Sequence, residues 1–291
     1  MSLPETEVAQ PGLASRPTVT RPGERVTVGE VVALGVLVML ALAAIVPGLF
    51  TPVDPLAISP TEAFQPPTAA HWFGTDESGR DVFARTIHGA RSSLLIGVAA
   101  TAIGMALALV LGIMGGIGAK PLDYTVTRIG EVLFALPGLL LALIFIAIVG
   151  PGIVTSTVAV GISTAPGYAR IIRSQIRAVR AAPYVEAATV LGRSRFTILH
   201  RNILPNALAP IFVLATLGVG QAIVWASSLS YLGLGAVPPA AEWGAMLSAG
   251  RSYISNAWWL TVFPGIFIVL AAGAATALGR SMQARTRQVE R

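Results

Sequence analysis

The stretch VVALGVLVMLALAAIVPGLF, residues 31–50, carries no charged side chain. It contains twelve Leu, Ile, Val or Phe residues, which together favour insertion into a bilayer by about 4–7 kcal/mol. A stretch of this length is enough for one helix to cross the hydrocarbon core of a membrane. We therefore predict a transmembrane helix near the N-terminus.

The composition of the whole chain extends this prediction. Of the 291 residues, 54% are hydrophobic and only 12% are charged, and the mean hydropathy is +0.72. A soluble domain usually carries about 25% charged residues. The chain has no cysteine, which excludes disulfides and thiolate metal ligands. We expect a polytopic membrane protein.

Further uncharged runs lie at residues 92–119, 132–169, 202–241 and 252–279. The run 132–169 is too long for one span, and Gly150-Pro151-Gly152 predicts a tight turn between two helices there. We expect a helix at about 207–232, and a last helix that begins near two interfacial anchors, Trp258 and Trp259. The sequence thus predicts an all-α fold with six transmembrane helices.

The basic residues indicate the orientation. With the N-terminus inside, sixteen of the 20 Lys and Arg residues fall on inner segments, and the outer ones are Arg80, Arg85, Arg91 and Arg251. This asymmetry fits the positive-inside rule, so both termini are expected in the cytoplasm and the net charge of +6 requires no nucleic-acid partner. The expected regions are a cytoplasmic tail (1–28), a first helix with an extracellular loop and amphipathic segment (29–91), a core of five helices (92–279) and a second cytoplasmic tail (280–291).

Small residues recur every four positions along the second predicted helix. They are Ala100, Gly104, Ala108, Gly112 and Gly116. Such a ridge lets another helix approach closely, which drives helix association in lipid. The ridge predicts tight packing within one subunit or, alternatively, a subunit interface or pore-lining helix.

The long inner loop, residues 169–206, combines charge with apolar surface. Its first arginines share one helical face and are expected to reach anionic lipid headgroups in part; they are Arg170, Arg173, Arg177 and Arg180. PYVEAATVLG (183–192) then predicts a short surface helix, with Pro183 in the first turn, Glu186 near the positive end of the dipole and Gly192 at the C-cap. We expect a further short helix that stops at Pro205.

Motifs for catalysis are missing from the sequence. GGIGAKP (115–121) lacks the Gly-Lys-Ser/Thr ending of a phosphate loop, and GVGQAI (218–223) lacks the third glycine of a dinucleotide site. The interiors of the predicted helices contain no ionisable residue, which argues against a self-powered carrier. We expect a protein that is not an enzyme and has no cofactor, and whose energy comes from elsewhere.

The inner loop resembles the EAA motif of ABC-importer permeases, which reads E-A-A, three residues, G, nine residues, I-x-L-P. Glu186-Ala187-Ala188, Gly192 and Leu204-Pro205 match this pattern, and Asn202 stands where the pattern has Ile. The resemblance implies a type I importer fold and a coupling helix at about 183–191. The implied ATPase-coupling residues are Tyr184, Val185, Glu186, Ala187, Ala188, Leu191 and Gly192, supported by Arg193, Leu204 and Pro205.

The outer stretch FGTDESGRDVFAR (73–85), followed by GARSSL, resembles the C-type permease of the peptide/nickel branch. Its signature residues are Phe73, Gly74, Thr75, Asp76, Gly79, Arg80 and Asp81. We expect them to be structural or to dock a binding protein. Residues 81–93 are expected to form an amphipathic segment at the outer headgroups. Two histidines, His71 and His88, lie near acids, but we do not expect a metal site there.

The resemblance also implies partners and a mechanism. The chain would be a multi-pass protein of the bacterial inner membrane that pairs with a B-type permease. Two ATPase subunits, or one fused ATPase, would use ATP and Mg²⁺ below it, and an extracellular binding protein would deliver the substrate for alternating access. Peptides are the expected substrate. Nickel or glutathione import, and a self-powered carrier or channel, are the alternatives.

Overall fold

The computed structural model describes residues 27–118 and 120–289, and its regular structure there is helical, with one isolated antiparallel bridge between Thr75 and Asp81. The elements are α1 (Val28–Ile45), η1 (Pro47–Leu49), η2 (Pro60–Glu62), α2 (Val82–Ile117), α3 (Lys120–Phe134), α4 (Gly138–Val149), α5 (Ile153–Arg180), α6 (Pro183–Val190), α7 (Arg195–Ile198), η3 (Leu199–Ile203), α8 (Leu204–Tyr231), α9 (Trp243–Gly250), η4 (Arg251–Tyr253) and α10 (Trp259–Val289).

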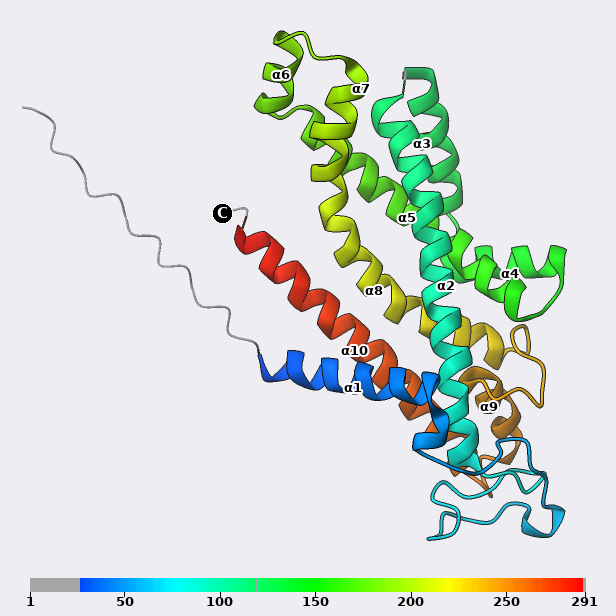
Figure 1. Cartoon of the computed structure of the whole chain (residues 1–291). Coiled ribbons are helices and arrows are strands. Elements are labelled where there is room, and N and C mark those ends of the chain that lie inside the picture. The colour runs from blue at the N-terminus through cyan, green and yellow to red at the C-terminus, as the bar shows by residue number, and fades with distance from the viewer. Residues whose placement is uncertain (1–26, 119, 290–291) are drawn as a thin grey trace, which may run out of the picture.

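Helix α2 is the longest element and forms the axis of the fold. Its 36 residues extend about 54 Å, well beyond the roughly 30 Å of a bilayer core. In Figure 1 it runs from the end that holds the loop 51–81 and α9 to the end that holds α3, and α6 and α7 lie at this second end too. The two ends of the molecule therefore carry different candidate sites.

Helices α1 and α10 lie side by side, although they are the first and last helices of the chain. Leu40 of α1 is fully buried, in a cluster that also contains Trp243, Ile268 and Ala271. Glu30 near the start of α1 pairs with Arg285 in α10, at 2.5 Å between Oε2 and Nη2. The beginning of the first helix is thus tied to the end of the last.

The number of membrane spans differs in part from the prediction. Among the helices in the described residues, four are long and apolar enough to cross a membrane: α1, α2, α8 and α10. Helices α3 and α4 meet at 92° and add a fifth span if the bent pair crosses as one unit. Helix α5 has 28 residues but is less apolar, because serine, threonine and glycine alternate with its aliphatic residues. The structure thus supports an all-α protein with four or five candidate spans.

The run 132–169 is divided at Gly150-Pro151-Gly152, as predicted, with α4 ending at Val149 and α5 beginning at Ile153. A further break divides the first part of the run, because α3 ends at Phe134 and α4 covers only Gly138–Val149, about 18 Å. Pro137 explains the break, because proline lacks the amide hydrogen and disfavours helical geometry in the residue before it.

Two further boundaries concern α2 and α8. Residues 82–93, expected to lead into the second helix, are continuous with it and form the first turns of α2, with Asp81 as the N-cap. The helix after Gly192 does not stop at Pro205: α7 continues through a π-helical turn, η3, into α8, and Pro205 occupies the first turn of α8. The Leu204 amide donates to the Leu199 carbonyl five residues back, and this π-helical turn lies directly before Pro205, which has no amide hydrogen to donate.

Candidate functional site

The short helix α6 has an N-terminus and a C-terminus that its sequence explains. Pro183 occupies the first turn. At the other end Gly192 adopts φ +72°, its amide donates to the Thr189 carbonyl at 3.0 Å, and the Arg193 amide donates to the Ala188 carbonyl at 3.2 Å. These two bonds form a Schellman motif, which favours glycine at the left-handed position. The predicted C-cap at Gly192 is therefore present.

Only one face of α6 attaches to the rest of the molecule. Val185 and Ala188 are buried in a cluster that includes Ile172 and Ile176 of α5 and Ile203 of η3. Residues three apart lie on the same side of a helix, so the other side is free. Tyr184, Glu186 and Ala187 are exposed on it, and so are Leu191 and Gly192 just beyond.

The exposed side is unusually apolar for a surface helix. Val190 is 82% exposed, Leu191 75% and Phe196, at the start of α7, 76%. The Glu186 carboxylate makes no hydrogen bond or ion pair with any residue that the structure describes. Contiguous apolar surface of this kind marks interaction sites. The geometry therefore favours a docking surface around α6.

A groove of about 860 Å³ runs between α6 and α7. Arg180, Arg193 and Arg195 line it together with Glu186, while Val185 and Ile198 contribute apolar atoms. Its charged groups are three cations and one anion. A partner surface that carries carboxylates would complement this groove.

The end of the motif lies where η3 meets α8. Leu204 is half-buried and Pro205 is exposed. Asn202, which replaces the Ile of the pattern, has its side-chain oxygen buried without a hydrogen-bond partner among the described residues. An unpaired buried polar atom costs about 1–3 kcal/mol. The departure from the pattern thus carries a local energetic cost.

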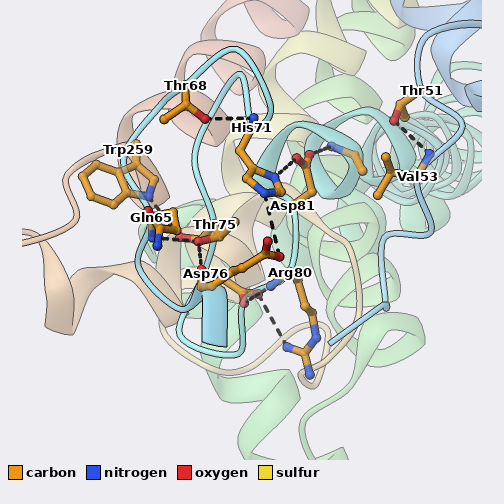
Figure 2. Close-up of polar contacts among 12 residues, drawn as sticks. Thr51, Val53, Gln65, Thr68, His71, Thr75, Asp76, Arg80, Asp81 and Trp259 are labelled. Carbon is orange, nitrogen blue, oxygen red and sulfur yellow. Dashed lines mark hydrogen bonds and ion pairs between the residues drawn. The ribbon is translucent and has the colours of Figure 1, made fainter. Parts of the chain in front are cut away.

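At the opposite end, the signature residues tie the loop 51–81 together (Figure 2). The Asp76 carboxylate accepts hydrogen bonds from the backbone amides of Ser78 and Arg80, both at 2.9 Å. Its second oxygen lies 3.6 Å from Arg80 Nη1 and 3.5 Å from Arg85 Nε. One buried carboxylate therefore holds a turn and pairs with two guanidinium groups.

Asp81 and Thr75 complete the loop (Figure 2). Asp81 caps α2 by accepting from the Ala84 amide at 2.7 Å, and its other oxygen lies 2.9 Å from His71 Nδ1. The Thr75 hydroxyl donates to the Glu62 carbonyl and accepts from the Gln65 amide. No group of three or more metal-ligating side chains occurs in the part of the chain that the structure describes.

The two signature glycines and Phe73 fit close contacts. Gly74 and Gly79 both have positive φ, and a Cβ at Gly79 would lie 1.8 Å from the Ser59 carbonyl oxygen. Phe73 stacks on Phe263 of α10 with ring centroids 3.9 Å apart. Trp259 is buried and its indole donates to the Thr75 carbonyl at 3.1 Å, so only Trp258 is exposed enough to act as the expected interfacial anchor. Each of the seven signature residues makes contacts within the loop or with α2 and α10, although Arg80 Nε is buried without a hydrogen-bond partner among the described residues.

Sequence reasoning missed a buried link between the start of α9 and α2. Glu242 is 2% exposed and caps α9 by accepting from the Gly244 and Ala245 amides, each at 2.8 Å. Ser93 of α2 donates to the same carboxylate at 3.2 Å and accepts from the Trp243 amide. An acid followed by an apolar run is a helix-start signal that would have found α9.

The small-residue ridge of α2 faces α5 of the same chain. All five of its residues are buried. A Cβ on Gly104 would lie 2.9 Å from the Gly161 carbonyl oxygen, and one on Gly112 would lie 2.6 Å from Ile172. The ridge thus lets the two helices approach at backbone distance.

The arginines of α5 also have partners that the sequence did not reveal. Arg173 contacts Asp123 of α3 through Nε at 2.7 Å and Nη2 at 2.6 Å, and Arg177 pairs with the same carboxylate. Arg170 instead stacks over the Phe134 ring, 4.6 Å from its centroid. Two of the four arginines therefore join α3 to α5.

The chain is similar in sequence to known membrane transport proteins. The chain is 40% identical to the probable D,D-dipeptide transport system permease protein DdpC of Escherichia coli (strain K12), over 82% of this chain and 80% of that one. It is also 40% identical to the dipeptide transport system permease protein DppC of Bacillus subtilis (strain 168), over 86% and 78%. The glutathione transport system permease protein GsiD of Pectobacterium atrosepticum is likewise 40% identical, over 75% and 72%.

A solved structure shares the fold. The crystal structure of an amino acid ABC transporter with histidines matches 70% of this chain and 94% of its own, with a TM-score of 0.56 at 20% identity. The family model for the binding-protein-dependent transport system inner membrane component matches residues 104–288. This confirms the expectation of a multi-pass inner-membrane transport subunit rather than an enzyme. The chain belongs to the family of binding-protein-dependent transport system inner membrane components.

Proposed function

We propose that this chain is the C-type membrane subunit of an ATP-driven importer of short peptides. Family membership implies an ATPase and a binding protein as partners. The observation that carries the proposal is the separation of two sites: an exposed apolar helix, α6, at one end and a tightly folded loop at the other (Figure 1).

The proposed topology has six crossings with both termini in the cytoplasm. The bent pair α3–α4 counts as one crossing and α5 as another, beside α1, α2, α8 and α10. This places α6 and its arginines in the cytoplasm and the loop 51–81 outside, as the positive-inside rule requires. The proposed regions stay those expected from the sequence, with tails at 1–28 and 280–291. Residues 1–26 and 290–291 lie outside the described part of the chain.

We assign the cytoplasmic site to ATPase docking. Tyr184, Leu191 and Phe196 present apolar surface, and Glu186 supplies a free carboxylate for a basic partner group. Two ATPase subunits, or one fused ATPase, would bind ATP and Mg²⁺, and their closure would move α6 together with α5. A B-type permease would complete the membrane pathway. The outer signature loop would support or contact the binding protein.

The names of two relatives describe dipeptide transport, and the name of a third describes transport of glutathione, which is a tripeptide. Peptide import is therefore the favoured function, and glutathione import is the second candidate. Uptake of radiolabelled di- to pentapeptides by the reconstituted complex, with glutathione and nickel as competitors, tests the assignment. Peptide uptake that needs ATP and is unaffected by nickel supports it. Nickel uptake without peptide uptake would overturn it.

Substitution of the docking surface tests the coupling role. Glu186→Lys reverses the free carboxylate, and Gly192→Asp strains the left-handed turn that ends α6. We expect both complexes to insert normally but to lose most peptide uptake while the ATPases still turn over. Thr125→Lys, which also introduces a positive charge at an exposed position, on α3 at the same end, is the control and should keep uptake. Unchanged uptake in Glu186→Lys and Gly192→Asp would contradict the assignment.

A further inference from the structure

A cavity of about 450 Å³ lies at the corner where α3 ends and α4 begins, and α5 and α8 form its other walls. The 92° bend between α3 and α4 opens this space. Phe134, Tyr168 and Trp225 supply aromatic walls. Ligand sites for small molecules typically have about 300–1,000 Å³ and combine apolar walls with a few polar groups. The cavity has the size and composition of such a site.

Three polar groups line this cavity without partners. The Arg170 guanidinium, the Gln221 amide and the Tyr168 hydroxyl make no hydrogen bond or ion pair with any described residue. Arg173 and Arg177, one helical turn or two further along α5, share the Asp123 carboxylate instead. Arg170 is thus a cation held over an aromatic ring with its donors free.

The chemistry of the lining selects an anion. No Asp, Glu or His is among the described residues that line the cavity, so a metal cation would find a guanidinium and no carboxylate. The planar fork of arginine matches a carboxylate with two parallel hydrogen bonds. Gln221 and Tyr168 can donate to and accept from a peptide group, and the rings can pack against side chains.

A second cavity of about 360 Å³ lies between α3 and α5 and contains Arg173 and Glu131. The two cavities share Phe134, Pro166 and Arg170 as a common wall. Arg170 therefore stands at the boundary between the cavity near Trp225 and the one near the inner ion-pair cluster of Asp123.

We propose that the cavity at the α3–α4 corner binds the imported peptide by its C-terminal carboxylate, with Arg170 as the group that recognises it. Gln221 and Tyr168 hold the adjacent peptide group. This inference rests on the proposed function of peptide import. It assigns a recognition step to the membrane subunit itself, in addition to recognition by the binding protein.

The test compares two peptides in one reconstituted complex of this chain, the B-type permease, the ATPases and the binding protein. One peptide has a free C-terminus and the other a C-terminal amide, chosen so that the wild-type complex imports both. In Arg170→Gln we expect uptake of the free acid to fall roughly tenfold, as for loss of a charged hydrogen bond, and uptake of the amide to fall less than twofold. The binding protein is the same in both complexes. Its own preference therefore cancels when the ratio of free-acid to amide uptake is compared between Arg170→Gln and the wild type.

Matched variants sharpen this comparison. Arg280→Gln changes an exposed arginine of α10 and should leave both peptides unaffected. Arg170→Lys keeps the charge and should keep the preference for the free acid. Equal loss of both peptides in Arg170→Gln, or no loss, would overturn the inference. Equal loss that occurs only in liposomes with anionic lipid would assign Arg170 to lipid phosphate instead, and so also overturn it.

A second measurement covers the case in which Arg170→Gln does not assemble. A peptide with a photoactivatable diazirine at its C-terminal residue should label segments 163–171 and 221–225 of the wild-type chain. Labelling elsewhere, with those segments unmarked, would refute the cavity assignment. If the wild-type complex imports no peptide at all, the proposed function fails, which is a distinct outcome from either failure of the cavity.

Discussion

At the residue scale, two glycines with similar backbone angles occupy different surroundings. Gly79 has φ +72° and Gly233 has φ +82°, so an L side chain is strained at both. A Cβ at Gly79 would lie 1.8 Å from the Ser59 carbonyl oxygen, whereas nothing lies within 4 Å of a Cβ at Gly233. Comparing the same substitution at the two positions therefore separates the cost of backbone strain from the cost of a steric clash.

We predict that Gly233→Ala lowers the stability of the purified protein by about 1–2 kcal/mol, the cost of the left-handed conformation alone. Gly79→Ala should lower it by clearly more, because the outer loop must also open. Thermal unfolding of the detergent-solubilised protein, monitored side by side, measures the difference. Equal shifts in melting temperature would show that the contact with Ser59 is relieved without cost.

At the element scale, most of the helices and the short α6 were predictable because apolar runs and turn residues determine them locally. The pattern of Pro183, Glu186 and Gly192 located α6 to within a residue. The break at Pro137 was missed, since hydropathy does not distinguish a bent helix from a straight one. Helix α9 was missed although Glu242 before an apolar run is a helix-start signal. The partners of Asp123 and Glu242 depend on tertiary contact, which no local pattern contains.

The packing of α2 on α5 gives a second matched pair. Gly104→Ala and Gly273→Ala each add one methyl group to a helix interior, where alanine is favoured by up to about 1 kcal/mol. The added Cβ would lie 2.9 Å from the Gly161 carbonyl oxygen at Gly104 and meets nothing within 4 Å at Gly273. We therefore expect Gly104→Ala to lower and Gly273→Ala to keep or raise the melting temperature. The same sign for both variants would contradict backbone-distance packing of the two helices.

At the scale of the whole molecule, the distribution of sites between the two ends depends on the number of crossings. Six crossings place both termini on one side, and five would separate them. The chain contains no cysteine, so single cysteines report their own side of the membrane without a background signal.

We predict that Val237→Cys, in the loop between α8 and α9, reacts with a membrane-impermeant maleimide in intact cells. Val190→Cys on α6 and Ala284→Cys near the C-terminus should react only after the membrane is permeabilised. All three positions are exposed in the isolated chain. Reaction of Ala284→Cys in intact cells would contradict the six-crossing topology, and reaction of Val190→Cys would contradict the cytoplasmic position of α6.

The pairing of α1 with α10 also has a consequence for how the protein is made. Leu40 and Glu30 find their partners in a helix that begins more than 200 residues later, at Trp259. At about 5–20 residues per second, a ribosome needs on the order of 10–40 s to supply that helix. During this time α2 can already pack against α1, but the side of α1 that faces α10 stays in contact with lipid, which its apolar residues on nearly every side make tolerable. The packing of the first span is therefore completed only after the last span has been made.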